Sequence, residues 1–377
     1  MHAMSSPVAL FVYNRADNTR QTLRALLYNT LAPQTDLYVY SDGGRDEASW
    51  ALVREVRAVL HEVEDEVRLT RALRSMTIVE RPVNYYLERN IIEGIADVFT
   101  RHDTVIVLED DIVTSPYFLQ FMNDAFRLYK DEPKVMHVSG FTRIDRMTND
   151  ESRSARNEES LSARRSARRD APYLENDEYK LPAHSKGNSY SSFVIRHSSL
   201  NSYFTPFMAG WGWGTWRDRW QQHFCHYQSR AEALEGLTAE DLDALEYGGL
   251  FPCLKHLDRQ PIPWDICWGI AIQRAGGLCL YPGRTLVRNI GLDAGTHFRS
   301  FDRQFTLFGK RLRLPLSRLI QRYEFDRPPY QHPIALTRQT PAKDPAVEAA
   351  MASALTDWGI RYTWLGRLLR RLLKKGR

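Results

Sequence analysis

Short apolar runs alternate with longer amphipathic stretches over residues 1–140, and this rhythm restricts the fold more than any other feature of the chain. The apolar runs are rich in β-branched and aromatic residues, which favour strands. They are Val8–Tyr13, Leu37–Tyr40, Met76–Val79, Val105–Leu108 and Val135–Val138. Apolar residues at helical spacing occur between them, around Leu23, Ile91 and Phe118. The alternation predicts an α/β fold in which helices cover both faces of a mostly parallel sheet.

Polar side chains follow four of the predicted strands, at the point where each strand ends. These exits are Tyr13-Asn14-Arg15, Asp42-Gly43, Arg81–Asn84 and Glu109-Asp110-Asp111. Any one of them, taken alone, is also ordinary turn or helix-cap chemistry. Ligands of parallel sheets bind at the carboxyl ends of the strands, so four polar exits together predict one cleft at that edge.

The acid triplet Glu109-Asp110-Asp111 is the strongest of these signals, because it follows the apolar run Val105–Leu108 directly. Burying carboxylates at the end of a strand is costly unless a cation or strong donors compensate. Hard oxygen ligands suit Mg²⁺ or Mn²⁺, which commonly bridge protein carboxylates and substrate phosphates. The alternative is a solvated acidic turn in which Asp110 or Asp111 caps a helix that begins near Pro116.

The segment Gly210–Trp216 alternates glycine and tryptophan. Flat rings on a permissive backbone suit stacking against a sugar, and they equally suit a packed plug in the core. The tryptophans in question are Trp211, Trp213 and Trp216.

Trp264 and Asp265 stand among prolines and further aromatic residues, so Asp265 is expected to be partly desolvated. Desolvation raises the pKa of a carboxyl, as a general base requires, although Asp265 is also a possible N-cap of the next helix. The loop Gly291–Phe298 carries two glycines and His297, which predicts a mobile lid over phosphate or metal.

Charge is distributed unevenly along the chain. Seven basic residues and no acidic one lie in residues 361–377, so the formal charge of +5 belongs to this tail rather than to the rest of the chain. This distribution argues against nucleic-acid binding and for a local electrostatic anchor. Leucines oppose the basic residues along a helical stripe, which predicts either a helix in an anionic membrane interface or a terminal helix docked on the body.

Targeting and redox signals are sparse. The sequence has no run of eighteen apolar residues and no visible signal peptide, and its four cysteines show no CxxC spacing. A cytoplasmic protein with reduced thiols is expected, peripheral on the inner face of the membrane if the tail binds lipid. Residues 148–190 begin with an Arg- and Ser-rich stretch that predicts a flexible insertion.

Taken in order, these motifs resemble glycosyltransferases of the GT-A, nucleotide-diphospho-sugar transferase fold. They are similar to bacterial family 2 enzymes and, in architecture, to the N-acetylglucosaminyltransferase I type. The resemblance covers Val8–Gly140 and Phe204–Phe298. It implies a nucleotide-sugar-binding half at 1–147, an acceptor-binding and catalytic half at 191–300, and a C-terminal extension at 301–377.

The resemblance also implies roles for individual residues. Tyr13, Asn14 and Arg15 match the exit that holds the nucleotide base, although the family has Asp where Asn14 stands. Asp42 resembles the residue that accepts from the uracil, and Glu109 the one that contacts the ribose. The remaining assignments are Asp110 as a donor contact, Asp111 and His297 as contacts of Mn²⁺ or Mg²⁺, Asp265 as the base, and Trp211, Trp213, Trp216 and Trp264 as the acceptor platform.

The expected activity is therefore inverting, metal-dependent transfer from a nucleoside-diphosphate sugar, UDP-linked by the resemblance, to a glycan or lipid-linked acceptor in cell-surface polysaccharide synthesis. One alternative is a sugar nucleotidyltransferase, which shares the sheet and the metal but usually has a Gly-rich basic loop after the first strand. The other is a membrane-peripheral, sugar-binding protein without catalysis.

Overall fold

The computed structural model describes residues 5–142, 144, 201–246, 253–291, 303–307, 310–314 and 328–351. The predicted insertion, His297 and the basic tail lie outside these ranges. Within them, the predicted α/β fold with a mostly parallel sheet and helices on both faces is confirmed.

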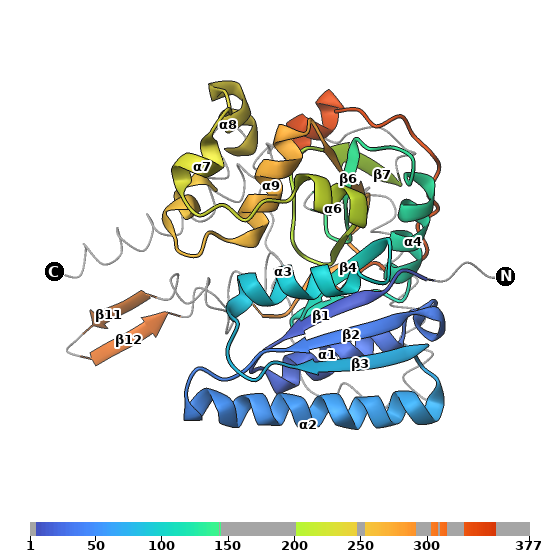
Figure 1. Cartoon of the computed structure of the whole chain (residues 1–377), viewed down its shortest axis with the longest axis vertical. Helices are drawn as coiled ribbons and strands as arrows, with labels where there is room; N and C mark the ends of the chain where they lie inside the picture. Colours follow the sequence, from blue (N-terminus) through green and yellow to red (C-terminus); the bar gives the residue numbers. More distant parts are fainter. Residues whose placement is uncertain are drawn as a thin grey trace, which may run out of the picture. The chain divides into compact units, whose positions relative to one another are not determined.

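An eight-stranded sheet in the order β3-β2-β1-β4-β8-β6-β9-β7 carries the fold (Figure 1). Its strands are β1 (Val8–Val12), β2 (Asp36–Ser41), β3 (Ser75–Glu80), β4 (Thr104–Glu109), β6 (Val135–Ser139), β7 (Ser202–Thr205), β8 (Trp213–Trp216) and β9 (Leu278–Pro282). Only β7 and β8 run antiparallel to their neighbours in this sheet. All five strands expected from the apolar runs are present, as β1, β2, β3, β4 and β6.

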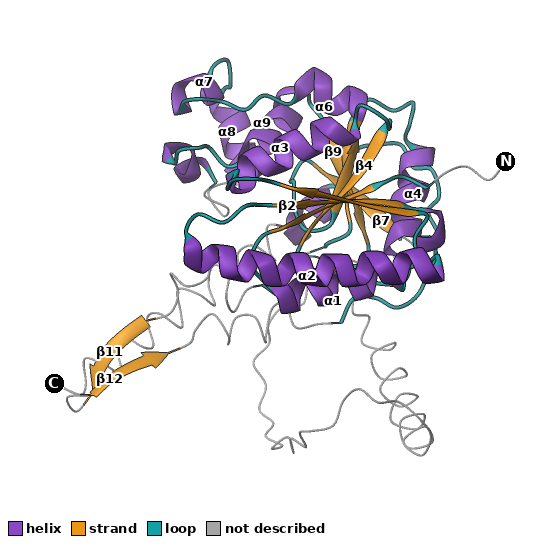
Figure 2. Ribbon diagram, turned by 60° about the horizontal axis from the view of Figure 1, so that its bottom comes forward, coloured by secondary structure: helices purple, strands orange, loops and turns teal. Residues whose placement is uncertain are grey.

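Helices lie on both faces because side chains alternate along each strand. Leu10 of β1 packs with α1 (Ala16–Leu27), α2 (Glu47–Thr70) and α4 (Phe118–Leu128). Its neighbour Phe11 points to the other face, where α3 (Tyr86–Val98), α6 (Arg217–His223) and α9 (Trp264–Arg274) pack. Figure 2 shows α1 and α2 on one side of the sheet and α3 and α9 on the other.

Smaller elements complete the described part. They are the antiparallel pair β5 (Ile112–Thr114) and β10 (Val287–Asn289), the hairpin β11 (Arg303–Leu307) and β12 (Lys310–Leu314), the helices α7 (Arg230–Leu234) and α8 (Ala239–Glu246), and the 3₁₀ turns η1 (Ala32–Gln34) and η2 (Leu254–Asp258). None of the described helices is long and apolar enough to cross a membrane. All four cysteines are free thiols.

Strand β8 lies between β4 and β6, although it comes from the second predicted half of the chain. Gly214 permits this insertion, since a Cβ there would stand 2.5 Å from the carbonyl oxygen of Val105 in β4. The stretches 1–147 and 191–300 thus contribute strands to one continuous sheet, and the predicted boundaries between them stay predictions.

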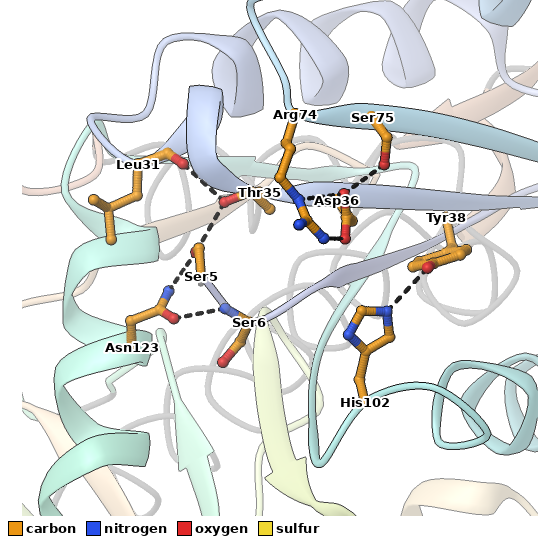
Figure 3. Close-up of polar contacts among 10 residues, drawn as sticks. All are labelled: Ser5, Ser6, Leu31, Thr35, Asp36, Tyr38, Arg74, Ser75, His102 and Asn123. Atoms are coloured by element: carbon orange, nitrogen blue, oxygen red, sulfur yellow. Dashed lines mark hydrogen bonds and ion pairs between the residues drawn. The ribbon is translucent and has the colours of Figure 1, made fainter. Parts of the chain in front are cut away.

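Polar side chains at the amino ends of the strands have a structural role (Figure 3). The carboxylate of Asp36 accepts hydrogen bonds from Arg74 Nε at 2.8 Å and from Ser75 Oγ at 2.5 Å. Asn123 of α4 accepts from the Ser6 amide at 2.7 Å. These contacts satisfy the polar groups that they join. The candidate site lies at the opposite, carboxyl edge of the sheet.

Candidate functional site

The acid triplet lies at the carboxyl end of β4, beside the end of β1. Glu109 pairs in register with Phe11, and Asp110 and Asp111 form the turn that leads into β5. Both aspartates are buried, at 3% and 9% exposure. Neither caps α4, because the Leu119 amide of that helix donates instead to Asn29 Oδ1 at 3.0 Å. The helix-cap alternative for the triplet is therefore wrong.

Arg15 joins the exit of β1 to the exit of β4. It is the residue just before α1, and its guanidinium forms an ion pair with Asp110 and a second one with Asp111, at 2.9 Å from Nη2 to Oδ2. Its neighbours Tyr13 and Asn14 are half-buried at the same exit, and the Tyr13 amide hydrogen-bonds Asp110. The residues predicted to contact the nucleotide-sugar donor at the ends of these two strands thus form one cluster.

Negative charge is concentrated in this cluster. Burial raises the pKa of Glu109 well above its ordinary value, and repulsion from Asp111 and Asp110 adds to the effect. Burial also raises the pKa of Asp110, to about 6, although Arg15 opposes the shift. The pKa of Asp111 is raised for the same reason. Burial disfavours the charged carboxylates, so a bound cation would stabilise them.

The chain after β10 packs directly on Asp111. The Ile290 amide donates to the Asp111 carbonyl oxygen at 2.8 Å, and β10 pairs with β5 so that Asn289 lies opposite Ile112. A Cβ on Gly291 would overlap the Asp111 carboxylate, so the backbone approaches this carboxylate closely. The predicted lid that contains His297 therefore begins in contact with the predicted metal ligand.

The donor atoms of the triplet suit a divalent cation. No cluster of three or more His, Cys, Asp or Glu side chains with metal-binding geometry occurs among the described residues. Mg²⁺ and Mn²⁺ in phosphate-transfer sites are commonly held by one or two carboxylates together with substrate phosphates and waters. A site with Asp111 as the protein ligand, completed by a diphosphate, fits both observations.

Asp42, at the exit of β2, organises the neighbouring loop. Its Oδ1 accepts hydrogen bonds from the amides of Gly43 at 2.9 Å and Tyr85 at 2.6 Å. Asn84 Nδ2 donates to the Gly43 carbonyl at 2.6 Å. Burial raises the pKa of Asp42, and the backbone donors oppose that shift. The exits of β2 and β3 are thus held together around one buried carboxylate.

Beside Asp42 lie Tyr86, in the segment Tyr85–Arg89 that the resemblance places near the donor, and Arg45, which was not expected from the sequence. The Arg45 guanidinium lies 5.5 Å from the ring centroid of Tyr13 and 4.7 Å from that of Tyr86. Tyr86 is 53% exposed and has a positive φ of 59°, which is uncommon for a residue other than glycine. The aromatic pair Tyr85-Tyr86 in the sequence was the available signal, but its partner Arg45 is distant in the chain.

Three of the four predicted acceptor tryptophans lie in the core: Trp213, Trp216 and Trp264. Trp213 is fully buried between the rings of His137 and Trp264, with centroids 5.2 Å and 5.1 Å away. Trp216 is 3% exposed and pairs in register with Thr104, at the amino end of β4 and away from the triplet. Stacking of an acceptor on either ring does not fit this burial, so the core-plug alternative is correct for both.

Trp211 lies closer to the candidate edge, whereas Trp264 stacks on Trp213 in the core. Trp211 is half-buried against Phe141, with ring centroids 4.7 Å apart, and precedes Gly212, whose position is close to Ile112 of β5. Trp264 is 4% exposed and begins α9. Trp211 therefore remains the better candidate for a sugar-stacking ring.

Replacing Trp213 with Ala is expected to lower the free energy of unfolding by about 3–5 kcal/mol, because the change leaves a cavity between two stacked rings. Trp211→Ala is expected to cost less stability than Trp213→Ala, because Trp211 is only half-buried, and to weaken acceptor binding. Urea unfolding of both variants measures the difference. Equal stability of Trp213→Ala and wild type would show that Trp213 is not a core residue.

Asp265 lies in the first turn of α9 and is half-buried, as expected. The N-cap of α9 is Pro263, so the N-cap alternative for Asp265 is wrong. Its Oδ1 accepts from the Ile266 amide at 2.9 Å. The negative charge of Asp265 is among the causes that raise the pKa of Glu109, so the two carboxyls lie within electrostatic range.

Comparisons with known proteins give only distant likenesses. No protein-family model and no curated protein matches the chain. The mannosyltransferase PcManGT from Pyrobaculum calidifontis, solved with GDP-Man and Mn²⁺, is 11% identical over 73% of this chain and 74% of that one, with a TM-score of 0.33. TarS 1–349 from S. aureus is 11% identical over 67% of this chain and 55% of that one, with a TM-score of 0.31.

A TarS 1–349 complex with UDP-GlcNAc is 14% identical over 36% of this chain and 33% of that one, with a TM-score of 0.26. The chain therefore spans less than two thirds of the TarS structures. Likeness at this level supports no conclusion about activity.

Proposed function

We propose that this protein is a metal-dependent, inverting glycosyltransferase that takes its sugar from a nucleoside-diphosphate donor, UDP-linked by the sequence resemblance. The observation that supports this most directly is the convergence of Arg15, Asp42 and the acid triplet at the carboxyl edge of β1, β2 and β4. A buried, largely acidic cluster with one guanidinium suits a diphosphate that arrives with a divalent cation.

The donor would lie across the strand exits. Tyr13, Asn14 and Asp42 would contact the nucleoside, and Glu109 and Asp110 would contact the ribose and diphosphate. Asp111, with His297 from the following loop, would hold Mn²⁺ or Mg²⁺, which neutralises charge on the leaving diphosphate.

Asp265 is the proposed general base. An acceptor hydroxyl attacks the anomeric carbon while the bond to the diphosphate oxygen breaks, and the hydroxyl proton passes to the Asp265 carboxylate. Attack from the face opposite the leaving group inverts the anomeric centre. The position of Asp265 on α9, within electrostatic range of Glu109, supports a role beside the donor.

The acceptor is proposed to be a glycan or lipid-linked intermediate of cell-surface polysaccharide synthesis, such as lipopolysaccharide. Trp211 would contact its sugar. The basic, leucine-striped sequence of residues 361–377 supports a peripheral position on an anionic membrane, where lipid-linked acceptors are available.

Two parallel incubations test the activity class. A panel of nucleotide sugars with Mn²⁺ is expected to release a nucleoside diphosphate from one donor. Nucleoside triphosphates with sugar phosphates are expected to release no pyrophosphate, and pyrophosphate release would favour a nucleotidyltransferase. Measurable nucleotide-sugar binding without turnover of any donor would favour a non-catalytic binding protein.

A further inference from the structure

Arg15 supplies positive charge inside the acid cluster itself. Its guanidinium contacts both oxygens of Asp110 and reaches Asp111 Oδ2 at 2.9 Å. The side chain is 27% exposed, whereas those of Asp110 and Asp111 are 4% and 12% exposed. Two buried carboxylates thus share one guanidinium, which is the group best suited to bridge them.

Hydrogen bonds to its backbone hold Arg15 at the start of α1. Its carbonyl oxygen accepts hydrogen bonds from both the amide and the hydroxyl of Thr19, at 2.9 Å each, in the first turn of α1. A Cβ on Gly291 would also press on the guanidinium, so the chain after β10 covers it. Arg15 is therefore built into the site, although part of its side chain stays exposed.

Arg15 and a divalent cation would compete for the same carboxylate. Asp111 is the proposed metal ligand, and its Oδ2 already accepts the guanidinium. A guanidinium and a divalent cation on one carboxylate repel each other strongly in a partly desolvated site. A nucleoside diphosphate brings further negative charge, which lessens this repulsion, together with oxygens that suit a guanidinium.

We propose that Arg15 is a specificity residue that competes with the free divalent cation for Asp111, so that metal binds tightly only together with a nucleoside diphosphate, whose phosphates then take over the guanidinium. This inference rests on the proposed function, because it takes Asp111 as the metal ligand. It makes metal and donor binding mutually dependent, with each raising the affinity for the other by the same factor.

The test is a calorimetric titration at pH 8 that measures the affinity of wild type and of Arg15→Met for Mn²⁺ alone. Without nucleotide, Arg15→Met is expected to bind Mn²⁺ about 5- to 150-fold more tightly than wild type, because the competing charge is gone. With saturating UDP, this advantage is expected to disappear. Arg15→Lys keeps a cation and should bind Mn²⁺ alone much as wild type does. Arg15→Gln removes the charge but keeps hydrogen-bond donors, and it replaces Arg15→Met if that variant does not fold.

Arg74→Gln is the matched control. Arg74 forms an equally close pair with a buried aspartate, Asp36, at the amino edge of the sheet (Figure 3). The Arg74→Gln variant should be less stable than wild type and should bind Mn²⁺ with unchanged affinity. Equal affinity of Arg15→Met and wild type for Mn²⁺ alone overturns this inference and leaves the transferase proposal intact. Absence of Mn²⁺ binding by both proteins, with and without UDP, overturns the inference and the metal-dependent mechanism together.

Discussion

Asp265→Asn is expected to lower turnover by about 10²- to 10⁴-fold while the affinity for the nucleotide sugar stays within about twofold of wild type. The amide keeps the shape of the side chain and cannot accept the hydroxyl proton of the acceptor. Because Asp265 is in the first turn of α9 and is half-buried, the substitution should fold normally. Steady-state kinetics with saturating donor and acceptor measures the loss.

Asp258→Asn is a suitable control for this variant. Asp258 ends η2, is exposed and pairs with Arg230 at 3.4 Å, so its loss should leave turnover unchanged. If Asp265→Asn retained turnover close to that of wild type, another group would have to be the base. A product with retained anomeric configuration would contradict the inverting mechanism itself, whichever residue takes the proton.

Asp111→Ala is expected to abolish the response to Mn²⁺ and to lower turnover by roughly a thousandfold, since several kcal/mol of charge stabilisation at the diphosphate would be lost. Calorimetry with UDP present should detect no tight Mn²⁺ binding. Asp65→Ala removes an exposed carboxylate from α2 and is the control. Equal Mn²⁺ dependence of Asp111→Ala and wild type would exclude Asp111 as the ligand.

The strands and the acid cluster could be predicted because their signals are local. The apolar runs that became β1, β2, β3, β4 and β6 are continuous in sequence, and parallel topology brings their exits to one edge. Glu109, Asp110 and Asp111 therefore needed no long-range information to be placed beside Arg15.

Other features depend on contacts between distant segments. The alternation around Trp213 looks the same whether its ring faces a ligand or the core, and only the insertion of β8 between β4 and β6 decides it. The pairing of Arg45 with Tyr86, and the packing of Gly291 on Asp111, join residues far apart in sequence. Spacing along one chain carries no signal for such contacts.

The most direct test of the central claim is the release of nucleoside diphosphate from a panel of nucleotide sugars, with and without Mn²⁺, in wild type and Asp111→Ala side by side. We expect wild type to release nucleoside diphosphate from one donor only when Mn²⁺ is present, and Asp111→Ala to release none above background. Absence of release from every donor by wild type, together with absence of nucleotide binding by calorimetry, would contradict a nucleotide-sugar site at the carboxyl edge of the sheet.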